Sequence, residues 1–158
     1  MLRISKLTDY ATVILGALAT QPDRQQTAAE IAARIHVGAP TVAKLLKQLH
    51  GANLVDSSRG LRGGYRLSRP ASEISAAAIL DALEGPVALT ECATQHKHCD
   101  IEGTCSVGGA WQHVSLAIRR SLEEITLAEL AGLTPAPVRF AAFDARLRSG
   151  MNRGSAKS

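Results

Sequence analysis

The sequence predicts a mainly α-helical fold with one small β-hairpin. Apolar residues recur at helical spacing along much of the 158-residue chain, and two short β-like runs flank a glycine-rich segment at 59–64. Two short helical stretches, joined by a tight turn, come directly before this hairpin. That order of elements is typical of a winged helix-turn-helix, and a long helix suited to dimerisation follows it here.

The amino-acid composition indicates what kind of core the chain can form and in which cellular compartment it acts. Hydrophobic residues make up 46% of it and aromatic residues 3%, so the core must be built from aliphatic side chains. No apolar run approaches the roughly 20 residues needed to span a bilayer, and the N-terminus lacks a signal pattern. We expect a cytoplasmic protein with no membrane partner, in which three cysteines do not form a disulfide framework.

Charge is distributed unevenly. Residues 1–70 hold ten Lys/Arg and four Asp/Glu, a net charge of +6, whereas residues 71–124 hold three and eight, a net charge of −5. A basic first half suits a polyanion such as nucleic acid. A solvated charged face would give the same count, so charge alone does not decide between the two.

Helical periodicity begins near the N-terminus. Residues 1–20 are predicted as a first helix with apolar positions Ile4, Leu7, Ala11, Ile14, Leu15 and Leu18. Pro22 and Asp23 then indicate a break. A second helix is predicted to begin at Thr27, because Thr27 and Glu30 have the spacing of a capping box.

A third helix is predicted after a sharp turn at Gly38, with Pro40 at its first position. Thr41, Lys44 and Lys47 fall mostly on the side opposite its apolar residues. A helix in this place can present them to base edges or phosphates of DNA, so they are the candidate recognition residues. A plain helical hairpin with a charged outer face is the alternative.

The hairpin that follows reads as a wing. Gly60, Gly63 and Gly64 allow the chain to reverse, and Arg59 and Arg62 lie at the tip. Two arginines there can reach phosphates or a narrow minor groove. The alternative is a surface hairpin whose arginines serve solubility, which the preceding helix-turn-helix and the basic first half make less favoured.

Two further helices are predicted after the wing. The first has Ser75 as its N-cap and ends at Gly85-Pro86. In the second, one seam is formed by Trp111, Val114, Ile118, Leu122 and Ile125, which step by 3, 4, 4 and 3 residues. Such a seam suits packing against another helix, and we expect a homodimer in which two of these helices pair. Packing on its own domain is the alternative.

The cysteines gather in one polar stretch. Six residues separate Cys92 from Cys99, and five separate Cys99 from Cys105. Three thiolates can hold a metal or an iron–sulfur cluster, with one position left for a different ligand. We therefore divide the chain into a winged helix-turn-helix DNA-binding domain (1–86), a cysteine cluster-binding loop (87–107), a dimerisation helix (108–132) and a flexible basic tail (133–158).

These motifs together resemble a known family. They are KLTDYA near the start, TAAEIAARIHVGAPTVAKLLKQLHGANLV, RGLRGGYRLSRP, ILDALEGPV and the three-cysteine loop. Over roughly residues 1–132 the chain resembles the IscR/NsrR-like winged-helix transcriptional regulators, most closely the SUF-system iron–sulfur assembly regulators. The resemblance implies a homodimeric bacterial regulator that binds a palindromic site in double-stranded promoter DNA.

The resemblance also implies the cofactor. In cluster-binding members the three cysteines hold a [2Fe–2S] or [4Fe–4S] cluster, and its occupancy or redox state sets DNA affinity. By this resemblance Cys92, Cys99 and Cys105 are the expected ligands, and genes for iron–sulfur cluster assembly (SUF) are the expected targets.

Two positions depart from the family pattern. Ala39 stands where a polar residue, often Ser, precedes the recognition helix. Gly108 stands where IscR-type members place a histidine, so the fourth ligand must come from elsewhere. The nearby candidates are Glu91, His96, His98, Asp100, Glu102 and His113. In some relatives a carboxylate of the N-terminal segment of the second subunit serves, which makes Asp9 of the partner subunit our hypothesis.

Three other functions compete with this interpretation. A zinc-stabilised regulator would use three cysteines and a histidine, although zinc sites usually show a closely spaced cysteine pair and this chain has none. A thiol redox or nitric-oxide switch of the same fold is the second. An enzyme is the third, and we do not expect one, because the chain shows no phosphate loop, nucleophile elbow or HExxH motif.

Overall fold

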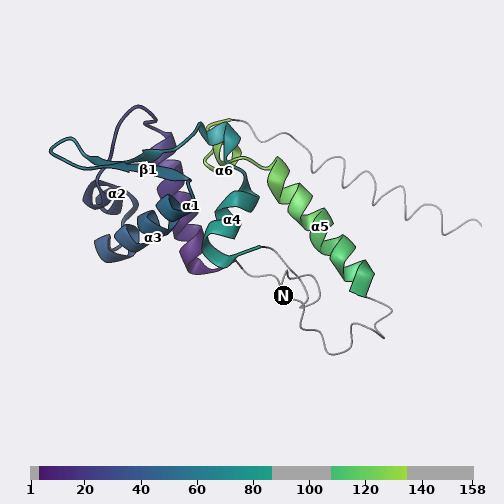
Figure 1. The fold of residues 1–158 in the computed structure, drawn as a ribbon. Helices are drawn as coiled ribbons and strands as arrows, with labels where there is room; N and C mark the ends of the chain where they lie inside the picture. Colours follow the sequence, from purple (N-terminus) through teal and green to yellow (C-terminus); the bar gives the residue numbers. More distant parts are fainter. Residues whose placement is uncertain (1–3, 87–107, 135–158) are drawn as a thin grey trace, which may run out of the picture.

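The computed structural model describes residues 4–86 and 108–134 (Figure 1). In chain order its elements are α1 (Lys6–Ala19), α2 (Ala28–Ile35), α3 (Ala39–Gly51), β1 (Val55–Ser58), β2 (Gly64–Leu67), the 3-10 helix η1 (Ala71–Glu73), α4 (Ala76–Glu84), α5 (Gly108–Glu124) and α6 (Leu127–Leu130). The predicted mainly helical fold with one β-hairpin is therefore confirmed. The predicted cysteine loop and nearly all of the predicted tail lie outside the described residues.

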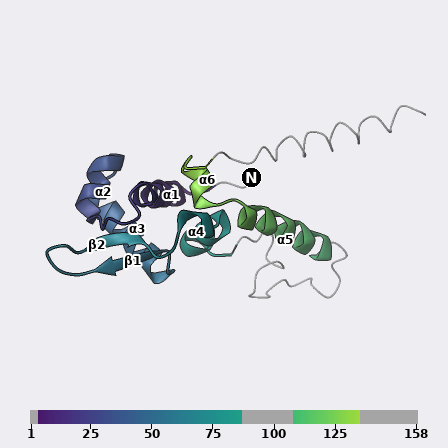
Figure 2. The ribbon, with the colours of Figure 1, turned by 90° about the horizontal axis from the view of Figure 1, so that it is seen from above.

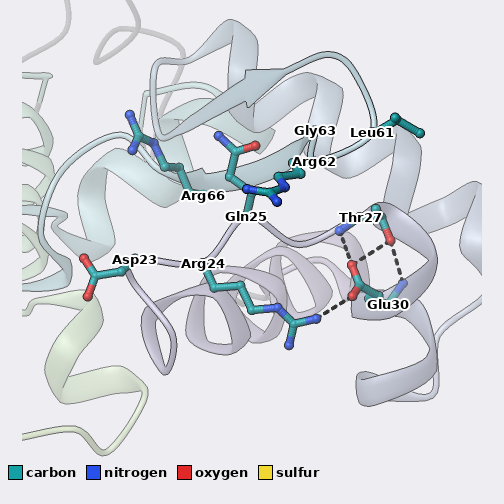
Figure 3. Close-up of a pocket in the computed structure, with 9 residues that line it drawn as sticks. All are labelled: Asp23, Arg24, Gln25, Thr27, Glu30, Leu61, Arg62, Gly63 and Arg66. Atoms are coloured by element: carbon teal, nitrogen blue, oxygen red, sulfur yellow. Dashed lines mark hydrogen bonds and ion pairs between the residues drawn. The ribbon is translucent and has the colours of Figure 1, made fainter.

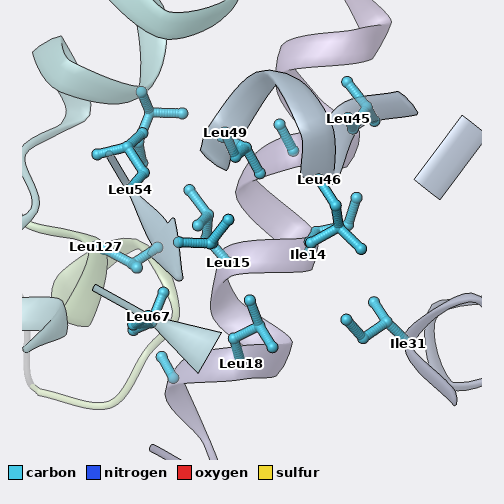
Figure 4. Close-up of a cluster of buried hydrophobic side chains, with 14 of the residues drawn as sticks. Ile14, Leu15, Leu18, Ile31, Leu45, Leu46, Leu49, Leu54, Leu67 and Leu127 are labelled. Atoms are coloured by element: carbon cyan, nitrogen blue, oxygen red, sulfur yellow. The ribbon is translucent and has the colours of Figure 1, made fainter. Parts of the chain in front are cut away.

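Helix α1 is the centre of the core. It contacts α2, α3, α4, α6 and β2, and its Ile14, Leu15 and Leu18 are almost completely buried. Figure 4 shows these side chains among leucines of α3, the hairpin and α6. Aliphatic side chains fill this cluster, as the low aromatic content requires, and their removal from water is the main force that holds the helices together.

The turn between α2 and α3 is built differently from the prediction. The capping box is present, with the Thr27 amide donating to Glu30 at 2.7 Å and the Glu30 amide donating to Thr27 at 3.2 Å. However, His36 adopts the left-handed conformation (φ 56°), while Gly38 has an ordinary φ of −56°. The prediction that Gly38 makes the sharp turn is wrong, because the C-cap of α2 already reverses the chain. Pro40 is the second residue of α3.

The hairpin has an antiparallel register that pairs Val55 with Leu67 and Ser58 with Gly64. A third segment joins it, since the amide and carbonyl of Gln26 bond the carbonyl and amide of Tyr65 at 2.9 and 2.8 Å. A Cβ on Gly64 would lie 2.8 Å from the Gln26 carbonyl oxygen, so this close approach requires glycine. The hairpin is thus fixed to the chain that leads into α2.

The predicted dimerisation helix over 108–132 is two helices. Helix α5 ends at Glu124, and Thr126 caps α6 in a second capping box. The chain is held extended between them, because the Ala76 amide donates to the Ile125 carbonyl at 2.8 Å and the Leu127 amide donates to the Ile74 carbonyl at 2.7 Å. Leu127 is fully buried in the core beside α1. The end of the predicted helix therefore belongs to the winged-helix domain.

The molecule is elongated. Figures 1 and 2 show α3 and the hairpin at one end, and α5 projecting from the opposite end. Helix α5 contacts α4, the helix before the cysteine segment. Within the described part of the chain, no helix combines the length and the apolar character that crossing a membrane would require.

Candidate nucleic-acid interface

Helix α3 presents two cations on its outer face. Leu45, Leu46 and Leu49 are fully buried, so the intervening Lys44 and Lys47 are exposed. Neither lysine forms an ion pair or hydrogen bond with any residue in the described ranges. Thr41 is half-buried in the first turn, where its amide donates to the Gly38 carbonyl at 3.0 Å. The helix can therefore offer two free ammonium groups to an anionic partner.

Apart from Thr41, the exposed side chains at the start of α3 are small and have no hydrogen-bonding groups. Its N-cap, Gly38, provides no side-chain cap, and Ala39, Pro40 and Ala43 are all exposed. Such side chains can contact a base edge only through methyl or methylene groups, and the thymine methyl is the apolar group of the major groove. Ala39, the position that departs from the family pattern, is therefore part of an exposed apolar surface that the sequence did not predict.

The wing tip is thin and basic. Arg59 and Arg62 are exposed and, in the part of the chain that the structure describes, have no acidic partner. Gly60 has a φ of 107°, and a Cβ on Gly63 would lie 2.5 Å from the Ser58 carbonyl oxygen, so both positions need glycine. Leu61, between the two arginines, is 110% exposed. Ser58 also donates a side-chain hydrogen bond to Gln25, which holds the wing against the chain before α2.

An open pocket of about 660 Å³ lies between the wing and the start of α2 (Figure 3). Its lining residues are Asp23, Arg24, Gln25, Thr27, Glu30, Leu61, Arg62, Gly63 and Arg66. Three arginines line this pocket together with the carboxylates of Asp23 and Glu30. The sequence had pointed to Arg62 alone, because Arg24 and Arg66 join it only when β2 pairs with the segment before α2.

The charges in this pocket are partly paired. Arg24 forms an ion pair with Glu30 at 2.6 Å, and Arg66 lies 3.8 Å from Asp56. Hydrogen bonds from the Thr27 amide and hydroxyl, with the nearby Arg24, hold the pKa of Glu30 below its ordinary value. Glu30 therefore caps α2 in its ionised form and pairs with Arg24. Of the three arginines in this pocket, Arg62 is the one without an acidic partner in the described residues.

The predicted fourth ligand, Asp9, lies exposed in the first turn of α1. That turn is tied to the end of α4, since Glu84 accepts hydrogen bonds from the Ser5 amide at 2.9 Å and from the Thr8 hydroxyl. These bonds lower the pKa of Glu84, with the Thr8 hydroxyl contributing most. Residues 87–107 follow α4, so Asp9 lies at the end of the domain from which the cysteine segment departs.

The donor set fits an iron–sulfur cluster by its chemistry. Cys92, Cys99 and Cys105 lie outside the described residues, and they would supply three thiolates. Asp9 has no hydrogen bond or ion pair from its side chain within the described ranges, so its carboxylate is free to serve as a ligand. Across residues 4–86 and 108–134, no three His, Cys, Asp or Glu side chains are grouped as metal ligands are.

Helix α5 carries apolar side chains that the other described residues leave exposed. Trp111 is 46% and Val114 is 40% exposed, and Leu116 is exposed on the other side of the helix. Ile118 and Leu122 of the predicted seam are half-buried, and Ile125 lies beyond the end of the helix. The structure thus presents Trp111 and Val114 of the seam to solvent in a single chain.

The sequence is similar to those of known proteins. Residues 4–132 match the family described as "Rrf2: Iron-dependent Transcriptional regulator". The HTH-type transcriptional regulator NsrR of Oceanobacillus iheyensis is 30% identical over 131 residues, which cover 82% of this chain and 89% of that protein.

Solved structures give the same result. The global cysteine regulator CymR of B. subtilis has a TM-score of 0.65 and 28% identity, covering 85% of this chain and 99% of that one. IscR of T. potens has a TM-score of 0.60 at 23% identity, covering 99% of this chain and 94% of that one, and so supports the fold. The predicted winged-helix fold and the resemblance to IscR/NsrR-like regulators are confirmed.

Proposed function

The chain belongs to the Rrf2 family of transcriptional regulators, and we propose that it regulates iron–sulfur cluster assembly (SUF) genes by sensing a cluster. The expectation of a regulator, not an enzyme, is confirmed by this membership. The observation that carries the proposal is the family match over residues 4–132, a range that includes all three cysteines. Its site of action would be the cytoplasm, where bacterial promoter DNA lies.

Helix α3 and the wing would form the DNA-reading surface. Lys44 and Lys47 would neutralise phosphates beside the major groove, and Thr41 would reach the edge of the groove. Arg59 and Arg62 would contact phosphates or the adjacent minor groove from the wing. What supports this assignment is that both elements lie at one end of the molecule and carry cations without partners in the described residues.

A homodimer would cover the apolar surface of α5. Trp111 and Val114 are exposed on a helix that projects from its own domain, and a second copy of α5 would cover them. Two α3 helices, one from each subunit, could then enter successive major grooves about 34 Å apart. The operator would be palindromic for the same reason.

The cluster would be held by Cys92, Cys99 and Cys105, with Asp9 of the partner subunit as the fourth ligand. When bound, the cluster supplies redox chemistry or sensitivity to iron and nitric oxide. The chain's own part is to provide three thiolates and one exchangeable oxygen ligand. A site shared between subunits would fix how the two α1 helices, and hence the two α3 helices, are spaced. Coupling of this kind is typically about 1–3 kcal/mol.

The test is purification without oxygen, followed by measurement of iron, sulfide and the visible absorption spectrum. Binding to SUF promoter DNA is then compared between cluster-loaded protein, cluster-free protein and the Cys99→Ser variant. We expect brown protein whose DNA affinity changes when the cluster is lost. Colourless protein that contains zinc would instead indicate the zinc-stabilised regulator, and thiols lost in pairs on oxidation would indicate the redox switch.

A further inference from the structure

Leu61 is fully exposed at the wing tip. Its relative exposure is 110%, whereas the next largest value among exposed large hydrophobic side chains of the described residues is 62%, at Ile4. Figure 3 shows Leu61 projecting from the wing loop into open space. Hairpin tips usually take polar or small residues, so a leucine with no packing contact here needs a reason.

The charges around Leu61 indicate the kind of partner that could bind over this side chain. Arg59 and Arg62 flank it in sequence and have no acidic partner in the described residues, whereas Arg66 on β2 lies 3.8 Å from Asp56 on β1. One leucine cannot supply the area of a stable protein interface. An apolar side chain between two arginines that have no acidic partner in the described residues is instead complementary to a polyanion with an apolar interior, and stacked DNA bases meet that description.

The shape of the tip fits the minor groove. Gly60, Gly63 and Gly64 remove side chains on both sides of the loop, so only Leu61 and the arginines extend from it. A side chain at the tip of such a loop can enter a groove about 6 Å wide, while the two-stranded body of the hairpin stays outside it. The arginines would then lie along the phosphates that border the groove.

Hydrogen bonds hold the wing against the rest of the domain. The Gln26–Tyr65 backbone bonds fix β2 to the chain before α2, and the Ser58–Gln25 bond fixes the end of β1. Close packing of Gly63 against the Ser58 carbonyl determines the shape of the tip. A rigid support lets an inserted side chain deform DNA without itself being displaced.

We propose that Leu61 inserts into the minor groove as an apolar wedge, partly unstacks one base step and bends the operator. Known minor-groove proteins use apolar side chains in this way. Pyrimidine–purine steps such as TA and CA unstack most easily, so the wedge would select them without a hydrogen bond. This inference rests on the proposed DNA-binding function, and it identifies an indirect contribution to sequence selection at that same interface.

The experiment begins with selection of bound duplexes from random DNA by the full-length protein. A selected duplex is labelled with 2-aminopurine at the step beneath the wing, and its bend is measured by fluorescence energy transfer between its ends. Variants Leu61→Ala and Leu61→Met are compared with wild type. Leu130→Ala is the matched control, because Leu130 is 48% exposed on α6 and outside the proposed interface.

We expect wild type and Leu61→Met to raise 2-aminopurine fluorescence and bend the duplex, and Leu61→Ala to lose most of both signals. The affinity of Leu61→Ala should fall about tenfold, which is typical of one lost specific contact. Its salt dependence should stay unchanged, because no phosphate contact is removed. Its melting temperature should match wild type, since Leu61 packs on nothing.

Two outcomes would overturn the inference in distinguishable ways. If Leu61→Ala bends and unstacks the duplex as wild type does, the wedge is wrong while DNA binding stands. If wild type enriches no duplex at all, both the proposed DNA-binding function and the wedge are wrong.

Discussion

The guanidinium of Arg119 on α5 donates two hydrogen bonds to the carboxylate of Asp81 on α4, at 3.0 and 2.8 Å. The two helices precede and follow the cysteine segment at 87–107, so this pair joins the two helices that flank the proposed cluster-binding loop. Arg119 also contacts Glu123 at 3.0 Å, one turn further along α5. Both carboxylates raise the pKa of Arg119, with the Asp81 hydrogen bond contributing most. A change within the loop could therefore reach the DNA-binding domain through α4.

Removing this pair should uncouple the loop from DNA binding. The side chains are 33% and 30% exposed, so Arg119→Ala should reduce the free energy of unfolding by no more than about 1 kcal/mol. Its larger effect should be on the ratio of DNA affinities with and without the cluster, measured by fluorescence anisotropy. Arg120→Ala is the control, because it removes the same charge from the next, exposed position. An unchanged ratio in Arg119→Ala would limit the pair to a structural role.

The wing arginines should contribute to the salt dependence of DNA binding. In the double variant Arg59→Ala, Arg62→Ala, the slope of log affinity against log salt should become shallower by about one unit per lost phosphate contact. Titration at several salt concentrations measures it, with Arg120→Ala as a control that removes one positive charge outside the interface. A slope equal to that of wild type would remove the wing from the phosphate contacts.

Asp9 should stabilise the cluster without affecting the fold. Because its exposed carboxylate has no partner in the described residues, Asp9→Ala should leave the melting temperature of the cluster-free protein unchanged. The visible spectrum should shift, and the cluster should decay faster in air than in wild type. Asp23→Ala, at an acidic position on the far side of the domain, should do neither. Identical spectra and lifetimes in Asp9→Ala and wild type would exclude Asp9 as the fourth ligand.

Contacts from the start of α3 should depend on thymine methyl groups. Ala39 and Ala43 are exposed and offer only methyl groups. Replacing thymine by uracil, one position at a time in the operator, should weaken binding at the positions these residues face, because uracil lacks the 5-methyl group. Ala43→Gly should remove the same sensitivity. Equal affinity for every uracil-substituted operator would show that α3 reads the groove in another way.

Stability should decrease in acid through Glu84. Its pKa in the folded protein lies below the ordinary value of 4.5, because the Thr8 hydroxyl and the Ser5 amide bond the ionised form. The stabilisation is therefore fully present above about pH 4.5, the unfolded value, and is lost as pH falls through the lower folded value. Urea denaturation at pH 7 and below pH 4.5 measures the loss. Glu84→Gln keeps an acceptor but does not titrate, so its stability should vary less with pH over this range.

That acid dependence is not expected to vanish in Glu84→Gln. Glu30 also has a lowered pKa, caused first by the Thr27 amide, and it titrates in the same range with the same sign. Thr8→Val tests the assignment from the other side, because it removes the largest cause of the Glu84 shift. If Thr8→Val and wild type lose stability equally in acid, the Thr8–Glu84 bond does not stabilise the folded protein.

Local hydrogen-bonding patterns could be predicted from the sequence, and they determined much of the fold. The Thr27–Glu30 capping box, the Ser75 N-cap and the end of α4 at Gly85 all occur as predicted. Each depends on residues no more than a few positions apart, so the spacing of residue types is sufficient to specify it. The hairpin is local in the same sense, since glycines at its turn bring adjacent runs together.

What only the tertiary structure decided involves residues distant in sequence. Ser5 and Glu84 are 79 positions apart, and Arg119 and Asp81 are 38 apart. Helix α5 ends at Glu124, and the backbone that follows it bonds to Ile74 and Ala76, which no local pattern reveals. The sequence therefore determined which segments are helices, which hairpin reverses and where three thiols gather. Packing around α1 decided which side chains meet. Burial of aliphatic surface sets the positions of the helices, and polar side chains then pair with the polar groups that these positions bring close.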